Sequence, residues 1–197
     1  MNKEIERKYA IDKLPSEIKI TKINNIEQAF IYSDGNTIVR IRKNTNMKEN
    51  TIEYIYTVKT TGDIQYKNNS NIGQKYEIEK NISCAEYEKL IQKKISNIIN
   101  KTRVVMPIEN NLKVEIDIYH DYLEGFLTAE IEFPNEEEAN KFNKPNWLGK
   151  ELGYKELSNR KLAEMTKEEF KRKVSEEAIE KNKKIISQLN DILQKSY

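Results

Sequence analysis

The stretch Glu4-Ile5-Glu6-Arg7-Lys8-Tyr9 decides the predicted fold, because charged and apolar residues alternate along it. Side chains two residues apart point to the same face of an extended strand, so Glu4, Glu6 and Lys8 share one face. Ile5 lies on the opposite face. We therefore expect a strand over residues 3–11 with one charged face and one apolar face.

The same alternation recurs along the chain. The further sets are Arg40/Arg42, Glu77/Glu79, Lys101/Arg103, Glu115/Asp117 and Glu130/Glu132, each interleaved with apolar residues. The pattern predicts strands over residues 26–33, 36–44, 51–61, 74–82, 98–107, 111–121 and 125–133. Asp34-Gly35 predicts a tight hairpin between the strands at 26–33 and 36–44.

Helices are predicted where capping signals precede amphipathic runs. Ser83 to Glu86 and Thr166 to Glu169 have the capping-box spacing, which predicts helices over residues 83–94 and 167–194. Asn135 is a candidate cap for a short helix over 136–142, and residues 157–164 form another short helical run. The polar stretch 62–73 is predicted to be a loop. We expect the whole chain, residues 1–197, to be one domain whose helices cover the apolar face of the sheet.

The charged face has two interpretations. It is either a solvent-exposed sheet face with cross-strand ion pairs, each worth about 0.2–1 kcal/mol, or the lining of a closed structure. An eight-stranded antiparallel β-barrel has room inside for one small ligand. Inward charges are costly unless they are paired or bound to a ligand. The number of charged sets favours an α+β fold with an eight-stranded closed barrel, a charged interior and helices outside.

The composition of this face favours phosphate chemistry. Its basic members, Lys8, Arg40, Arg42, Lys59, Lys101 and Arg103, suit phosphate oxygens. Its acidic members, Glu4, Glu6, Glu77, Glu79, Glu115, Asp117, Glu130 and Glu132, are oxygen ligands that suit Mg²⁺ or Mn²⁺. Phosphate-binding cations and metal-binding carboxylates in one cavity are typical of a phosphoryl-transfer site.

The bulk composition excludes several classes of protein. The chain has 34 Lys and Arg against 32 Asp and Glu, so its charges largely balance and a general nucleic-acid binder is disfavoured. We find no apolar run of membrane-spanning length and no apolar signal stretch, and expect no membrane association. Cys84 is the single cysteine and His120 the single histidine, which fits a cytoplasmic protein without a Cys/His zinc site. His120 and Trp147 are expected to be structural.

The ordered charged sets resemble the CYTH superfamily, the triphosphate tunnel metalloenzymes. Glu4, Glu6 and Lys8 match the ExExK signature of that family, and the sets from Arg40 to Glu132 follow in the family order. Trp147-Leu148-Gly149 and the later Ser158-Asn159 continue the match. Gly153-Tyr154-Lys155-Glu156 departs from the usual pattern, which leaves the role of this segment open.

The resemblance implies a tunnel that hydrolyses or cyclises triphosphates with Mg²⁺ or Mn²⁺. By position, Glu4, Glu6 and Glu132 would hold the catalytic metal with Glu130 near it, and Lys8, Arg40, Arg42, Lys59, Lys101 and Arg103 would bind the triphosphate. Lys59 matches a proposed general acid, so Lys59 and Glu6 are the predicted catalytic residues. Glu77, Glu79, Glu115 and Asp117 would orient the basic residues or bind a second metal.

The leading hypothesis for function is hydrolysis of inorganic triphosphate to diphosphate and phosphate. A class IV-type adenylyl cyclase, a thiamine or nucleoside triphosphatase and a non-catalytic polyphosphate-binding module are the alternatives. The expected partner is a small-molecule triphosphate, with no nucleic acid or membrane partner, and the chain is expected to be a monomer or a homodimer.

Overall fold

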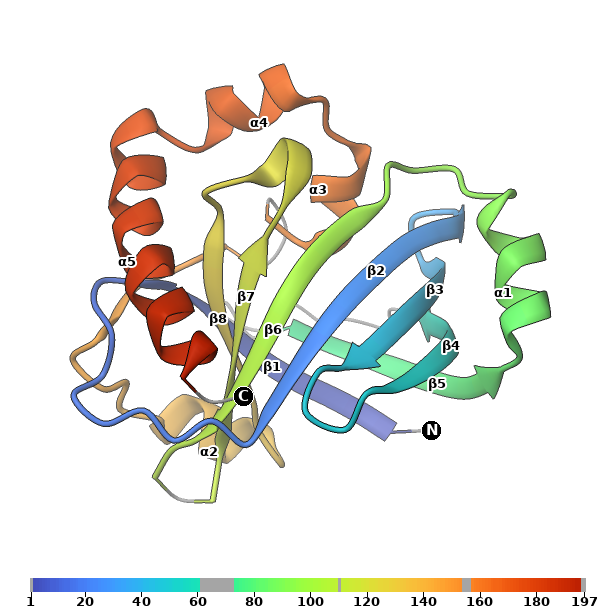
Figure 1. Cartoon of the computed structure of the whole chain (residues 1–197). Helices are drawn as coiled ribbons and strands as arrows, with labels where there is room; N and C mark the ends of the chain where they lie inside the picture. Colours follow the sequence, from blue (N-terminus) through green and yellow to red (C-terminus); the bar gives the residue numbers. More distant parts are fainter. Residues whose placement is uncertain (1, 61–72, 110, 154–156, 196–197) are drawn as a thin grey trace.

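The chain folds as a strongly curved antiparallel sheet with helices around it (Figure 1). A computed structural model describes residues 2–60, 73–109, 111–153 and 157–195. The predicted loop 62–73 falls almost wholly outside these ranges, as do residues 154–156. The strands are β1 (Asn2–Ile11), β2 (Lys22–Ser33), β3 (Thr37–Asn46), β4 (Thr51–Thr60), β5 (Gly73–Ile82), β6 (Ile99–Pro107), β7 (Lys113–Tyr119), β8 (Leu127–Glu132) and β9 (Leu148–Glu151).

The predicted starts of the helices are confirmed by their capping residues. Capping boxes open α1 (Cys84–Ile91) at Ser83 and α4 (Lys167–Lys173) at Thr166. Asn135 caps α2 (Glu136–Lys141), and Ser158 caps α3 (Asn159–Glu164). Each cap side chain accepts a hydrogen bond from a backbone N–H that has no partner within its helix.

The predicted single helix over residues 167–194 is wrong. Val174 has an extended backbone, with φ −114° and ψ 117°, and ends α4. The Ser175 side chain then accepts a hydrogen bond from Ala178 N and starts α5 (Glu176–Gln194). Ser175 is thus a second cap inside one helical pattern, and the chain changes direction there.

The predicted eight-stranded closed barrel is also wrong, although the α+β class is confirmed. The strands form one nine-stranded antiparallel sheet in the order β5-β4-β3-β2-β6-β7-β8-β1-β9, with a further pairing of β1 and β5. β1 pairs with β8 along one edge, while its other edge pairs with β5 from Asn2 to Glu6 and with β9 from Tyr9 to Ile11. The ninth strand forms because the backbone groups of β1 beyond β5 need partners.

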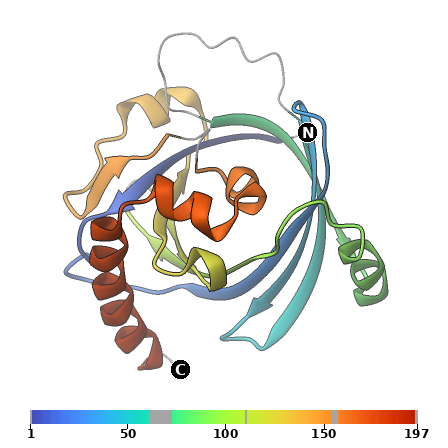
Figure 2. The ribbon, with the colours of Figure 1, turned by 90° about the horizontal axis from the view of Figure 1, so that it is seen from above.

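The curvature gives the sheet a concave and a convex face. Figure 2 shows the strands curving around a common axis, with α3 and α4 over one end and the other helices outside. On the convex face α5 packs through Ile185 and Leu189 against a core that includes Ile116 and Ile131. α1 packs through Tyr87 and Ile91 against β2 and β3. The charged sets that alternate with these apolar residues, such as Arg40/Arg42 and Glu115/Asp117, therefore lie on the concave face.

The segment around Trp147 joins the same core. Trp147 is buried, as predicted, and its carbonyl accepts hydrogen bonds from the backbone N–H groups of Asp12 and Lys13. No helix in the described ranges is both long and apolar enough to cross a membrane.

Candidate active site

Arg103 is the centre of a buried ion-pair network on the concave face. Its Nε donates to Asp117 Oδ1 at 2.6 Å, and its Nη2 donates to Glu130 Oε2 at 2.8 Å. Its Nη1 contacts Glu115. β6 brings Arg103 directly opposite Asp117 of β7, and β7 brings Glu115 directly opposite Glu130 of β8. Strand register therefore assembles this network, as the alternating pattern predicts.

Lys8 connects the network to the chain that leads into α3. Its Nζ lies 2.8 Å from Glu130 Oε1 and donates to the carbonyl of Leu157 at 3.1 Å. Burial disfavours the ammonium, but the Glu130 carboxylate outweighs that effect and raises the pKa of Lys8. The same two cations, Lys8 and Arg103, overcome the effect of burial on Glu130 and hold its pKa well below the usual range.

Lys101 differs from Lys8 because the site lowers its pKa and so disfavours its charged form. It is buried and pairs with Asp117, with 2.5 Å between Nζ and Oδ2. Burial and the nearby Arg103 guanidinium lower the pKa of Lys101 to about 8, against the opposing effect of Asp117. Asp117 has the opposite shift: burial raises its pKa, but Arg103 and Lys101 outweigh burial and lower it.

A second group of charges occupies β3, β4 and β5. Arg40 lies 3.2 Å from both Glu77 and Glu79, and Arg42 lies 2.8 Å from Glu79. Lys59 Nζ is 3.3 Å from Glu77 Oε1. Burial and the adjacent Arg40 lower the pKa of Arg42 to about 10, despite the attraction of Glu79. The basic side chains thus lie on two sides of the concave face.

β2 lies between these two groups and presents polar atoms without partners. Asn24 lies opposite Arg103, and Gln28 lies opposite Arg42, so both face the concave side. Asn24 Oδ1, Gln28 Nε2 and the Nε atoms of Arg40 and Arg42 are buried without a hydrogen-bond partner in the described part of the chain. A buried polar atom without a partner costs about 1–3 kcal/mol. These atoms therefore fit a polar ligand between the two groups.

The predicted metal carboxylates are only partly described. Glu6 of β1 lies directly opposite Glu132 of β8, and like charges in such a position repel each other. The side chain of Glu4 lies outside the described residues. Within the described ranges no group of three or more Asp, Glu, His and Cys side chains is placed to hold a metal ion. The assignment of Glu4, Glu6, Glu130 and Glu132 to a metal stays a prediction.

Two residues that the sequence analysis did not select also contact this face. Thr57 donates to Glu79 at 2.9 Å and accepts from Arg40. Tyr119 is buried near Lys101 and donates to Asn159 Oδ1 at 2.8 Å, which ties α3 to the sheet. Thr57 lies in phase with Lys59, and Tyr119 with Asp117, so strand alternation is the signal that identifies both. His120, one position further, lies on the convex face.

A curved antiparallel sheet with phosphate-binding cations on its concave face is typical of proteins that act on triphosphates. We therefore compared the chain with known proteins. No family model matches the chain. A curated relative, an inorganic triphosphatase of Nitrosomonas europaea, is 25% identical over 162 residues, which cover 81% of this chain and 96% of the relative.

Solved structures are also similar to this chain. A crystal structure of an inorganic triphosphatase is 26% identical with a TM-score of 0.55, covering 83% of this chain and 95% of that one. A protein from Pyrococcus horikoshii OT3 is 19% identical with a TM-score of 0.53, over 70% of this chain and 82% of that one, and shows the fold alone. The predicted resemblance to the CYTH superfamily, the triphosphate tunnel metalloenzymes, is confirmed.

Proposed function

We propose that this chain hydrolyses inorganic triphosphate to diphosphate and phosphate on the concave face of its sheet, with Mg²⁺ or Mn²⁺. One observation carries the proposal: buried polar atoms of β2, and of the arginines of β3, have no hydrogen-bond partner in the described part of the chain, and β2 lies between the two groups of cations. The similarity to an inorganic triphosphatase over most of both chains supports it.

The basic side chains bind the substrate in this proposal. Arg40 and Arg42 approach from β3, whereas Lys8, Lys101 and Arg103 approach from β1 and β6. A linear triphosphate carries several negative charges, and guanidinium groups bind two phosphate oxygens at once. Cations on both sides would hold the phosphate chain straight and fix the phosphorus that is attacked.

The acidic side chains have two roles in this proposal. Glu77, Glu79, Glu115, Asp117 and Glu130 contact the basic residues and orient them. We assign the metal to Glu4, Glu6 and Glu132, which lie on β1 and β8. The register pair of Glu6 and Glu132 fits a cation, because an ion between them removes their repulsion. When bound, a divalent ion neutralises phosphate charge and orients water.

Lys59 is our candidate for proton donation. It lies on β4 within 3.3 Å of Glu77, beside the arginines that bind the substrate. The bond from the attacked phosphorus to the bridging oxygen breaks, and the diphosphate that leaves takes up negative charge. A proton from the Lys59 ammonium to that oxygen would assist its departure.

One assay tests the reaction. The protein is incubated with Mg²⁺ or Mn²⁺ and tripolyphosphate, ATP or thiamine triphosphate, and orthophosphate and cyclic AMP are measured. We expect orthophosphate from tripolyphosphate and no release without the divalent ion. Cyclic AMP from ATP would instead identify a cyclase. Binding of all three compounds without turnover would identify a polyphosphate-binding module.

A variant tests the metal assignment. Glu6→Gln should lower tripolyphosphate turnover about 100-fold or more, since the metal contributes several kcal/mol to the transition state, and should leave the circular dichroism spectrum unchanged. Glu88→Gln on the exposed face of α1 is the matched control and should keep full activity. Full activity of Glu6→Gln would remove Glu6 from the metal site.

A further inference from the structure

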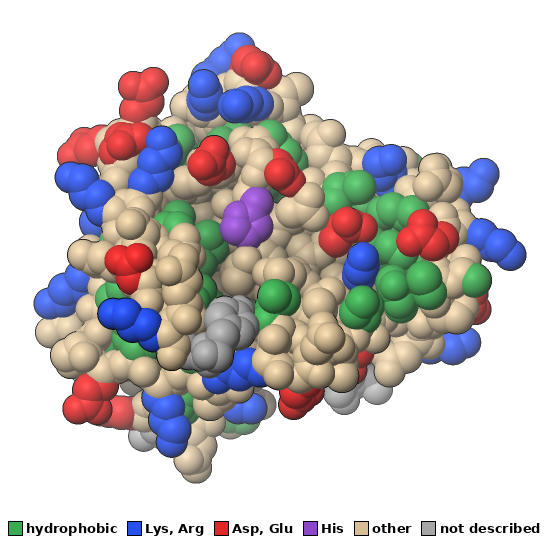
Figure 3. Space-filling view, viewed as in Figure 1, with side chains coloured by type: hydrophobic (Ala, Val, Ile, Leu, Met, Phe, Trp, Pro, Cys, Tyr) green, Lys and Arg blue, Asp and Glu red, His purple; other side chains and the backbone are tan. Residues whose placement is uncertain are grey.

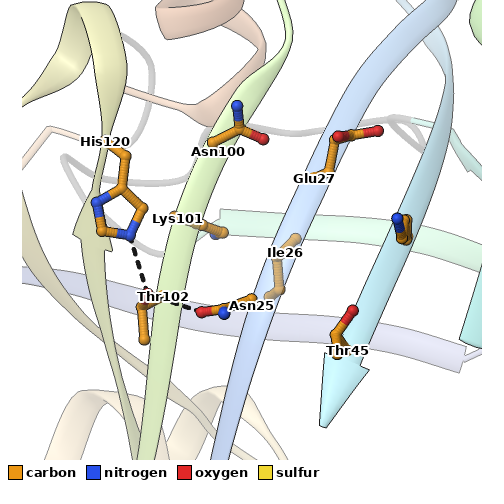
Figure 4. Close-up of a pocket in the computed structure, with 9 residues that line it drawn as sticks. Asn25, Ile26, Glu27, Thr45, Asn100, Lys101, Thr102 and His120 are labelled. Carbon is orange, nitrogen blue, oxygen red and sulfur yellow. Dashed lines mark hydrogen bonds between the residues drawn. The ribbon is translucent and has the colours of Figure 1, made fainter. Parts of the chain in front are cut away.

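A hollow of about 340 Å³ lies on the convex face, on the opposite side of the sheet from the candidate active site. Figure 3 shows His120, the single histidine, in a depression between the helices on either side. Figure 4 shows the lining side chains, which come from β2, β3 and β6 and from the residue that follows β7. Small-molecule sites begin at about this size.

Strand register arranges the lining in two rows. In the first row Glu27 of β2 lies opposite Lys43 of β3 and Asn100 of β6. In the second row Asn25 lies opposite Thr45 and Thr102. Residues directly opposite each other on neighbouring strands have Cβ atoms about 4.5–5.5 Å apart, so the rows form one continuous polar surface.

This polarity departs from the rest of the convex face. The convex positions next to the hollow on the same strands are Ile23 and Ala29 on β2, Ile41 on β3 and Val104 on β6, and all of them are fully buried. Helices and the segment before β2 cover those apolar positions. The polar rows therefore occupy the gap that the covering elements leave.

A chain of hydrogen bonds determines the tautomer of the neutral His120 ring. Thr102 Oγ1 donates its single proton to Asn25 Oδ1 at 2.9 Å. The 2.9 Å contact from the same oxygen to His120 Nε2 must then be a bond that His120 donates. The neutral ring consequently carries its proton on Nε2, and Nδ1 remains an acceptor.

Two opposite charges lie side by side in the first row without neutralising each other. Glu27 accepts a hydrogen bond of 2.6 Å from the Tyr87 hydroxyl. Within the described residues no ion pair within 4.0 Å joins Glu27 to Lys43, although the two are cross-strand neighbours. The hollow therefore offers a carboxylate and an ammonium from directly opposite positions on neighbouring strands.

We propose that this hollow binds a small zwitterion of the amino-acid or dipeptide class. The ligand ammonium pairs with Glu27, and its carboxylate pairs with Lys43. Hydroxyl and amide groups of the second row form hydrogen bonds with the polar atoms of the ligand that lie between its ammonium and its carboxylate. Lys101 and Ile26 also line the hollow, but by strand register their side chains lie on the concave face. The proposal is independent of the triphosphatase activity, because the groups that would bind the ligand, Glu27, Lys43 and the second row, lie on the convex face.

The single histidine provides the test. The proton resonances of the His120 ring are followed by NMR at pH 7.5 while glycylglycine is added to the full chain. N-acetylglycinate, which lacks the ammonium, and glycinamide, which lacks the carboxylate, are the matched probes. We expect a saturable shift with glycylglycine and at least tenfold weaker binding of the two singly charged probes.

Variants separate the site from general effects. Glu27→Gln keeps an oxygen that accepts from Tyr87, and Lys43→Met keeps the length of the side chain, so both should fold and both should weaken glycylglycine at least tenfold. Glu88→Gln and Lys89→Met on the exposed side of α1 should bind as the unmodified chain does. No saturable shift, equal binding of N-acetylglycinate, or unchanged binding by either variant would each overturn the proposal.

Discussion

At the scale of single residues, Lys101 shows how burial tunes a charged group. Its ammonium is surrounded by protein and lies near the Arg103 guanidinium, and these effects lower its pKa to about 8. In the free protein Lys101 is charged below that pH and increasingly neutral above it.

This titration predicts a pH dependence of substrate binding. If Lys101 binds phosphate, KM for tripolyphosphate should rise as the pH increases from 7 to 9.5, by at most tenfold for each unit above about 8. Lys101→Arg stays charged over that range and should remove the rise. Steady-state kinetics at half-unit intervals measure it. The same profile in both proteins would show that another group is responsible.

Glu130 predicts a stability effect, because it neutralises both Lys8 and Arg103. Glu130→Gln should reduce the free energy of unfolding by about 3–5 kcal/mol, since two buried cations lose a carboxylate. Urea denaturation at pH 7 measures the loss. The control is Glu137→Gln, which breaks an exposed pair with Lys141 and should cost less than about 1 kcal/mol.

The same carboxylate sets the direction of the acid response. Its pKa is lowered in the folded state, so its contribution to stability is complete above the unfolded value of about 4.3 and is lost as the pH falls below it. Glu130→Gln should therefore lose less stability on acidification than the unmodified chain. An equal loss in the two proteins would contradict this role.

At the scale of elements, the start of each helix was more predictable than its length. Ser83, Asn135 and Thr166 each cap a helix because a short side chain meets the free N–H groups within one turn. Such signals are local. The break at Val174 depends on packing, because α4 and α5 contact different hydrophobic clusters. Ser175 is a single serine without a capping box, and a serine of this kind also occurs inside ordinary helices, so the sequence alone did not identify it as a cap.

Substitutions at two glycines distinguish the cost of backbone strain from the cost of close packing. Gly35 and Gly125 have φ of +97° and +84°, but an added Cβ would meet nothing within 4 Å at Gly35 and would lie 2.6 Å from Ile179 Cγ2 at Gly125. Gly35→Ala should cost about 1–2 kcal/mol for backbone conformation alone. Gly125→Ala should cost a further 1–3 kcal/mol or so, because Ile179 of α5 must move. Equal losses on urea denaturation would contradict the close approach of α5.

At the scale of the whole molecule, strand alternation sorts the charges. The net charge is only +2, yet basic and acidic side chains concentrate on the concave face. Alternation was sufficient to predict which residues share that face. It was not sufficient to predict β9, because a strand of four residues at Leu148–Glu151 shows no alternation of its own and forms where β1 extends beyond β5.

The collected cations predict that substrate stabilises the fold. Tripolyphosphate with EDTA, at a concentration 100-fold above its Kd, should raise the free energy of unfolding by about 2.7 kcal/mol. Thermal denaturation measures the change, and sulfate at equal ionic strength should give a much smaller shift. Arg42→Ala should reduce the tripolyphosphate shift, whereas the exposed Arg172→Ala should not. Equal shifts in both variants would place Arg42 outside the binding surface.

The three partners of β1 also have a consequence for biosynthesis. β1 is synthesised before the other strands, but its partners are β5, β8 and β9, which end at Ile82, Glu132 and Glu151. The backbone groups and the apolar residues of β1, Ile5 and Ile11, therefore have no partner strands until most of the chain has been synthesised. Pairings between such distant segments form slowly and leave strand edges exposed to aggregation. The strand that carries Glu6 and Lys8 is thus synthesised before all of its partners and pairs completely only when they are present. Nascent chains should therefore acquire the complete site only after β9 has emerged.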